Sequence, residues 1–225
     1  NSIGPVFGTA SANTKQIEDH YNVLPTYYDP YAQNRLVTFL DNHDKNRFMS
    51  SGLANNNLSR LANALSFLYS SRGIPCLYQG TEQAFNGGTS PNNREDVFDG
   101  QYEQGPSAGD NFSMTHAAFR HVAQLNNFRR LYPALRTGTH INRWNNNSGP
   151  GLFAYARRLD TQEVLVVLNT AGSNQTMPDR ASLYPPGTVM VNLFNTNETI
   201  TVTAATNTPS ITVPGTSCKM FIARA

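Results

Sequence analysis

Residues 36–44 read LVTFLDNHD, and this stretch decides how the first half of the chain folds. Its first five residues form a nearly continuous apolar run, which is typical of a parallel strand buried on both faces. The run ends abruptly at four polar residues, Asp41, Asn42, His43 and Asp44. Functional sites of α/β proteins form where parallel strands end at their carboxyl side, so these residues are candidates for one. On spacing alone, a polar turn whose side chains cap backbone N–H groups is the simpler interpretation.

The sequence after this stretch predicts a second strand parallel to the first. Leucines recur at helical spacing and predict a helix over residues 58–71, which Gly73 and Pro75 end. Residues 74–78 form another short apolar run. Strand, helix and strand at this spacing predict a βαβ unit, in which the two strands run parallel. Cys76 lies inside the second run, which favours a free, buried thiol.

The sequence pattern changes from helices and long loops to short strands after about residue 138. Residues 79–112 are rich in Gly, Asn, Asp and Pro, which predicts a long loop, and loops of this length are usually functional. Residues 114–131 predict a helix, and we expect no helix beyond residue 131. Several short strand patterns follow, separated by Pro and Gly turn signals, which predicts an antiparallel sandwich. We therefore expect an α/β part over residues 1–138 and an all-β part over residues 139–225. The strands expected in the second part cover residues 152–157, 164–168, 189–194, 199–203 and 219–223.

Composition narrows the possible functions without choosing among them. Hydrophobic residues make up 39% of the 225 residues, enough together with 16 glycines to build a core. Charged residues make up only 14%, and the 17 Lys and Arg and 15 Asp and Glu are scattered, which excludes a basic stripe for nucleic acid. No run of about 18 apolar residues predicts a membrane-spanning helix. The polar surface must come from Asn, Ser, Thr, Gln and Tyr, which suits neutral, hydroxyl-rich ligands and equally suits a secreted protein with a neutral surface.

Three motifs in order resemble one family. Residues 38–44, TFLDNHD, resemble the fourth short motif of the α-amylase family, glycoside hydrolase family 13, in which an apolar strand precedes an acidic residue, Asn, His and Asp. Residues 73–83, GIPCLYQGTEQ, resemble that family's last barrel strand, and residues 131–138, LYPALRTG, resemble the end of its last barrel helix. The resemblance implies an α/β plus all-β fold, in which the C-terminal part of a (β/α)₈ barrel is followed by an antiparallel β-sandwich domain.

The same resemblance assigns roles to the polar residues after the first strand. Asp44 matches the family's third carboxylate, which holds sugar hydroxyls and stabilises an oxocarbenium-like transition state by placing a fixed anion near developing positive charge. His43 matches the histidine that hydrogen-bonds the same sugar. Asn42 and Asp41 match positions that we expect to be structural.

Residues 87–94, GGTSPNNR, are most similar to the cyclodextrin glucanotransferases and their close amylase relatives. In those enzymes an Asp-Pro-x-Asn-Arg stretch grips sugars on the donor side, so the resemblance implies that Arg94 binds sugar. Ser90 stands at the position of the Asp, which weakens the grip that transferases use. An ion pair of Arg94 with a loop carboxylate such as Glu95 or Asp96 is the structural alternative.

The two carboxylates that cleave the glycosidic bond are missing from the motifs. Retaining glycosidases need a nucleophile and an acid/base about 5–5.5 Å apart. In this family they are an Asp in a Gly-x-Arg-x-Asp strand and a Glu ending the next catalytic strand, and residues 1–35 contain neither. We therefore expect a cleavage product or a piece of a longer protein that is inactive alone. Its two barrel strands should be covered by the missing N-terminal part of the barrel, by a second copy or by another chain.

The resemblance implies an α-amylase-type retaining hydrolase acting on α-1,4-glucans such as starch and maltooligosaccharides. It implies no cofactor in this chain, and calcium in the intact enzyme through ligands that lie mostly outside this chain. It also implies an extracellular location and no membrane or nucleic-acid partner. A glucanotransferase of the same family stays open as an alternative, as does a non-catalytic glucan-binding fragment or one half of a split enzyme.

Overall fold

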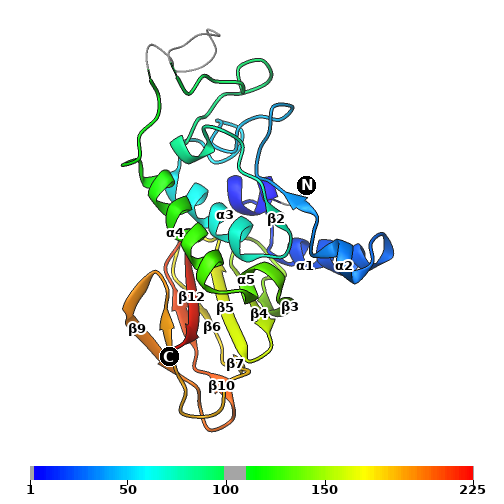
Figure 1. Ribbon diagram of the computed structural model, residues 1–225, viewed down its shortest axis with the longest axis vertical. Coiled ribbons are helices and arrows are strands. Elements are labelled where there is room, and N and C mark those ends of the chain that lie inside the picture. Colours follow the sequence, from blue (N-terminus) through cyan, green and yellow to red (C-terminus); the bar gives the residue numbers. More distant parts are fainter. Residues whose placement is uncertain (1–2, 99–109, 225) are drawn as a thin grey trace.

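The computed structural model describes residues 3–98 and 110–224, and Figure 1 shows helices gathered at one end and antiparallel strands at the other. Among the described residues, no helix is both long and apolar enough to span a membrane. The helical elements are η1 (Gly4–Gly8), α1 (Lys15–Val23), η2 (Leu24–Thr26), α2 (Pro30–Gln33), α3 (Leu58–Ser70), η3 (Thr81–Gln83), α4 (Ala117–Leu131) and α5 (Ala134–Thr137). The strands are β1 (Val37–Thr38), β2 (Ile74–Pro75), β3 (Thr139–Asn145), β4 (Leu152–Leu159), β5 (Gln162–Asn169), β6 (Gln175–Met177), β7 (Arg180–Ala181), β8 (Val189–Asn192), β9 (Asn195–Thr201), β10 (Asn207–Thr208), β11 (Ile211–Val213) and β12 (Ser217–Ala223).

The predicted βαβ unit is confirmed. β1 and β2 pair in parallel, with Val37 opposite Ile74, and α3 connects them. α3 begins after Asn57, whose side chain accepts a hydrogen bond from the backbone N–H of Arg60 at 3.1 Å and so satisfies one of the free donors of the first turn. Arginines from α4 and β4 donate to carbonyl groups at its C-terminal end, where such groups otherwise lack partners. These contacts fix the helix between the two strands and the antiparallel part.

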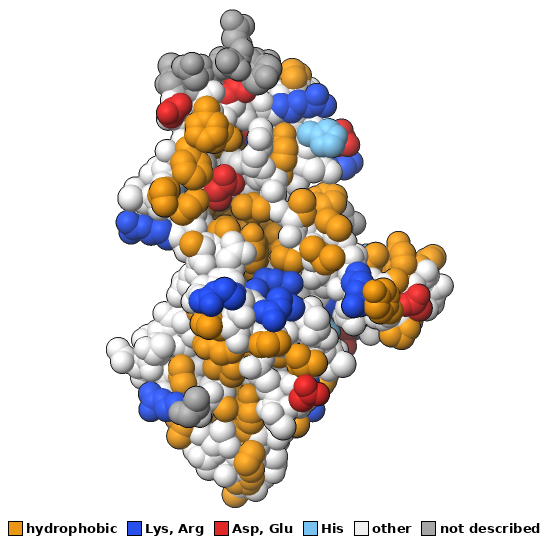
Figure 2. All heavy atoms as spheres, viewed as in Figure 1, with side chains coloured by type: hydrophobic (Ala, Val, Ile, Leu, Met, Phe, Trp, Pro, Cys, Tyr) orange, Lys and Arg blue, Asp and Glu red, His pale blue; other side chains and the backbone are white. Residues whose placement is uncertain are grey.

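The outer side of β1 and β2 contradicts the expected burial on both faces. Val37, Phe39 and Ile74 are 59%, 46% and 49% exposed, because no element of the described chain covers them. Hydrophobic side chains also reach the surface at several other places in the view of Figure 2. The expected burial of Cys76 is wrong for the same reason, since its thiol is free but exposed just after β2.

The antiparallel part is a six-stranded sheet in the order β3-β4-β5-β12-β8-β9, and two small sheets pair β6 with β11 and β7 with β10. Alternate residues of β4 and β5 enter two separate cores. Phe153 and Val166 belong to the core shared with the helices, whereas Ala154 and Val167 belong to the core shared with β6 and β11. Because both faces of the sheet are covered, β4 is buried at consecutive positions.

The strands predicted for the second part each overlap an observed strand. β3 was not predicted, because its sequence THINRWN has no regular apolar alternation. The short strands β6, β7, β10 and β11 were not predicted either. The expectation of no helix beyond residue 131 is wrong, since α5 adds one short helix after Pro133.

Candidate functional site

Residues 41–45 follow β1 and form a corner of the chain, which carries one buried carboxylate and one exposed carboxylate. Asp41 is only 2% exposed; its Oδ2 accepts the backbone N–H of Phe48 at 2.9 Å and its Oδ1 accepts the hydroxyl of Thr81 at 2.8 Å. Burial raises the pKa of Asp41, although these hydrogen bonds oppose the effect. Asn42 turns the chain by accepting the backbone N–H of Asp44 at 3.0 Å. Asp41 and Asn42 therefore stabilise the corner through hydrogen bonds within the protein, whereas the side chains of His43 and Asp44 are exposed.

His43 and Asp44 form an exposed pair at the carboxyl end of β1. The imidazole Nε2 lies 3.3 Å from the carboxylate Oδ1, and the two side chains are 62% and 65% exposed. A pair so open to water contributes little to stability. Its polar atoms are instead accessible to a ligand, and a carboxylate beside an imidazole can accept and donate hydrogen bonds to sugar hydroxyls.

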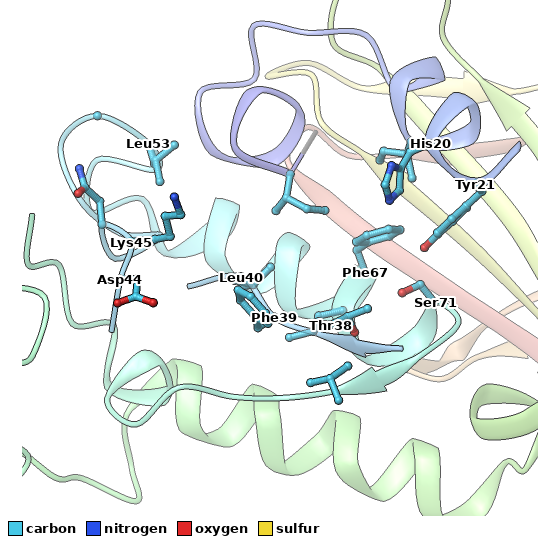
Figure 3. A pocket seen from close by; sticks show the side chains of 16 residues that line it. His20, Tyr21, Thr38, Phe39, Leu40, Asp44, Lys45, Leu53, Phe67 and Ser71 are labelled. Carbon is cyan, nitrogen blue, oxygen red and sulfur yellow. The ribbon is translucent and has the colours of Figure 1, made fainter. Parts of the chain in front are cut away.

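A cavity of about 710 Å³ runs from this corner along β1. Figure 3 shows Asp44 and Lys45 at one end and Tyr21 at the other, with Phe39 and Phe67 between them. The middle of the cavity is thus apolar and aromatic, and only its end at Asp44 offers charged groups. The middle suits the side chains of a covering polypeptide, whereas the Asp44 end suits a hydroxylated ligand.

A loop over residues 86–96 holds the corner from below the surface. Asn93 is fully buried, and its side-chain amide donates to backbone carbonyl groups of the corner. Arg47 and Glu95 are buried as well and form an ion pair, with Nε 2.8 Å from Oε2. The sequence motif alone predicts neither of these roles, because both depend on contacts between segments that are about 50 residues apart.

Arg94 projects from the same loop but remains exposed. Its backbone N–H donates to the carbonyl of Pro91 at 2.9 Å, and its guanidinium makes no ion pair with any residue that the structure describes. The alternative pairing with Glu95 is not observed, because that carboxylate is bound to Arg47. A sugar contact by Arg94 stays a prediction that its exposure permits.

Comparison with known proteins decides the family. A family model for the catalytic domain of α-amylases matches residues 7–111. The chain is 34% identical over 161 residues to an α-amylase of Niallia circulans, covering 68% of this chain and 27% of that protein. It is 37% identical over 140 residues to a cyclomaltodextrin glucanotransferase of the same species, covering 62% of this chain and 17% of that protein. The chain belongs to the α-amylase family.

Solved structures extend the similarity to the fold of the whole chain. A cyclomaltodextrin glucanotransferase, CldA, superposes with a TM-score of 0.80 at 27% identity, covering 99% of this chain and 43% of that one. An Anoxybacillus α-amylase superposes with a TM-score of 0.79 at 21% identity, covering 99% of this chain and 45% of that one. The family member described here thus has an α/β plus all-β fold, the C-terminal part of a (β/α)₈ barrel followed by an antiparallel sandwich.

The chain spans only a small part of the curated relatives that it matches, between 13% and 27% of their length. Calcium in the intact α-amylase-family enzyme stays a prediction. Within residues 3–98 and 110–224, no three His, Cys, Asp or Glu side chains lie together as a metal-binding group.

Proposed function

We propose that this α-amylase-family chain supplies Asp44, His43 and Arg94 to the sugar site of an enzyme that hydrolyses α-1,4-glucans with retention of configuration. The observation that carries the proposal is the exposed His43–Asp44 pair at the carboxyl end of a parallel strand, held by the buried side chain of Asn93. Asp44 stabilises the oxocarbenium-like transition state, because a fixed anion attracts charge that develops only as the bond breaks. His43 binds hydroxyl groups of the same sugar, and Arg94 binds sugars on the donor side.

The chemistry of bond cleavage must come from other carboxylates. Asp41 cannot serve as nucleophile or acid/base, because it is buried and both its oxygens accept hydrogen bonds within the protein. We propose that the chain alone is inactive and that a polypeptide carrying the first part of the barrel covers β1 and supplies both groups. The exposure of Val37, Phe39 and Ile74 supports such a cover. A second copy or an unrelated chain could bury the same side chains but would not supply the missing motif.

The test compares the chain alone with a completed barrel. We expect no starch or maltooligosaccharide hydrolysis by the 225-residue polypeptide. A chimera in which this chain follows the N-terminal barrel segment of the related α-amylase from Niallia circulans should hydrolyse maltooligosaccharides. The matched variant Asp44→Asn, which keeps the shape of the side chain and removes its charge, should lose most of that activity. Hydrolysis by the chain alone, or equal rates for the two chimeras, would contradict the proposal.

A glucanotransferase is the second candidate, because several relatives that are 32–37% identical bear that name. Ser90 favours hydrolysis, since a carboxylate at this position would strengthen the donor grip that transfer needs. Product analysis of the chimera separates the two, because cyclic or lengthened glucans indicate transfer and short linear products indicate hydrolysis. Glucan binding by the chimera without any turnover would instead favour a non-catalytic glucan-binding role. An extracellular location of the intact enzyme follows from the polymeric substrate and is proposed with it.

A further inference from the structure

The side chain of Asn93 contacts the backbone on both sides of Asp44. Its Nδ2 lies 2.8 Å from the carbonyl oxygen of His43, 2.7 Å from that of Lys45 and 3.3 Å from that of Asn42. A side-chain amide carries two N–H donors, so two short bonds and one longer shared contact use its whole donor capacity. Asn93 is 0% exposed, so water does not compete for these bonds.

The carbonyl oxygen of the same amide forms no such hydrogen bonds. Oδ1 of Asn93 is buried and has no hydrogen-bond partner among the described residues. An unpaired buried acceptor lowers stability, and an apolar side chain of similar size would fill the space without that cost. The presence of Asn at this position is therefore explained by its donor end, which holds the corner.

The other bonds that tie the loop of residues 86–96 to this part of the chain reach Arg47, beyond residues 42–45. The Glu95 Oε2 binds Arg47, while its Oε1 accepts the backbone N–H groups of Asn86 at 3.0 Å and Gly87 at 2.8 Å within the loop. The backbone N–H of Arg47 also donates to the carbonyl of Gly87 at 3.0 Å. These bonds anchor the loop to the end of the corner. Within the described chain, Asn93 is the one side chain from another segment that hydrogen-bonds the backbone of residues 42–45.

We propose that Asn93 is a positioning residue that holds the His43–Asp44 pair in place for the sugar, rather than a residue that grips sugar itself. Its side chain faces the protein, whereas that of Arg94, the next residue, is exposed. One loop thus fixes the transition-state-stabilising carboxylate from beneath and carries a sugar-binding cation above. The catalytic consequence rests on the proposed function of Asp44. A carboxylate that must meet developing charge has to be set before the reaction, and small misplacements carry large rate losses.

The first test uses the chain as it is and needs no activity. The backbone N–H groups of Asp44 and Lys45 are hydrogen-bonded to Asn42 within the corner, so their exchange with deuterium reports whether the corner stays closed. In Asn93→Ala we expect exchange at these two amides to be at least about tenfold faster, from the loss of the buried hydrogen bonds. Exchange at the amides of β4 and β5 should change far less.

Asn92→Ala is the matched control for this measurement. Asn92 is the preceding asparagine of the same loop, but it is exposed and its side chain forms no hydrogen bond with the described residues. Its substitution should leave exchange at Asp44 and Lys45 at the wild-type rate. If Asn93→Ala does not fold, Asn93→Ser, which keeps a hydroxyl donor, is measured in its place. Unchanged exchange at the two corner amides, or an equal rise in β4 and β5, would overturn the proposal.

The second test uses the active chimera and separates positioning from sugar binding. For Asn93→Ala we expect kcat per folded active site to fall roughly 10- to 100-fold with KM nearly unchanged, because the group that it moves acts in the transition state. Arg94→Ala should mainly raise KM. A kcat that stays at the wild-type value in Asn93→Ala, while Asp44→Asn lowers it, would overturn the positioning role. If Asp44→Asn leaves kcat unchanged, the proposed function fails, and the exchange measurement still decides whether Asn93 holds the corner.

Discussion

The six-stranded sheet and the β1–β2 pair arise from similar short apolar runs, yet they end in opposite surroundings. Val166 and Val167 of β5 are both fully buried, because helices cover one face of the sheet and β6 and β11 cover the other. Val37 of β1 is 59% exposed, because the described chain covers one side of its strand only. An apolar run thus reports a strand, while the elements packed on that strand determine whether it is buried.

The comparison also separates the source of stability from the site of function. The covered sheet carries residues of both cores. The open pair carries the His43–Asp44 corner and the apolar cavity beside it. We therefore expect substitutions of buried side chains to lower the free energy of unfolding, and substitutions of the exposed side chains around β1 and β2 to affect assembly and activity more than stability.

The largest expected effect is that of Phe153→Ala in the covered sheet. Phe153 is 0% exposed and contacts the rings of Phe67 and Tyr155, with centroids 6.1 Å and 5.3 Å away. Its truncation should lower the free energy of unfolding by about 4 kcal/mol, because it leaves a cavity between the sheet and the helices. Urea denaturation followed by circular dichroism measures this. A loss below about 1 kcal/mol, the size of an ordinary surface change, would show that this core is not tightly packed.

Arg47→Met should have the next largest effect, and it acts on the part of the molecule that contains β1, β2 and the corner. It removes the partner of Glu95, a carboxylate that is 1% exposed, and the cation above the ring of Tyr78. Breaking a buried ion pair on one side should lower the free energy of unfolding by about 3 kcal/mol. The same denaturation measurement applies, with Arg94→Met on the neighbouring loop position as the exposed control. Equal stabilities of the two variants would mean that the buried pair does not tie the loop to the corner.

These features differ in how far the sequence could predict them. Leucine spacing predicts α3, and the polar residues after the apolar run predict the corner, because both are local patterns. The hold of Asn93 on the corner, 48 to 51 positions away in sequence, could not be predicted, since no local pattern encodes which distant carbonyl an amide will meet. β3 could not be predicted for a related reason. Its polar side chains form hydrogen bonds with residues distant in sequence, such as Asn142 with Glu18 and Arg143 with Glu163, and its sequence shows no apolar face.

A smaller effect is expected from a histidine on the covered side. Both ring nitrogens of His140 are buried without hydrogen-bond partners, its ring stacks 4.4 Å from that of Tyr155, and burial lowers its pKa well below the ordinary 6.5, with nearby Arg157 and Arg72 adding to the effect. As the pH falls below 6.5, the unfolded chain binds a proton that the folded chain does not, so stability falls by up to roughly 1 kcal/mol per pH unit. His140→Phe removes this loss. Its advantage over wild type in urea denaturation should therefore grow between pH 7 and pH 5.5, and an advantage independent of pH would contradict the buried neutral imidazole.

The smallest effect is expected for Val37→Thr, which we compare with the same substitution at Val167 in the covered sheet. Val37→Thr on the open side should change the free energy of unfolding by less than about 0.5 kcal/mol, because the new hydroxyl stays in water. Val167→Thr in the covered sheet places the same hydroxyl at a position that is 0% exposed, and should lower it by about 1–3 kcal/mol. If a polypeptide covers β1 in the complete enzyme, Val37→Thr should become as costly as Val167→Thr when both are measured in the chimera. A Val37→Thr effect that stays equally small there would show that the side chain remains in water, and that β1 is not the surface on which the barrel is completed.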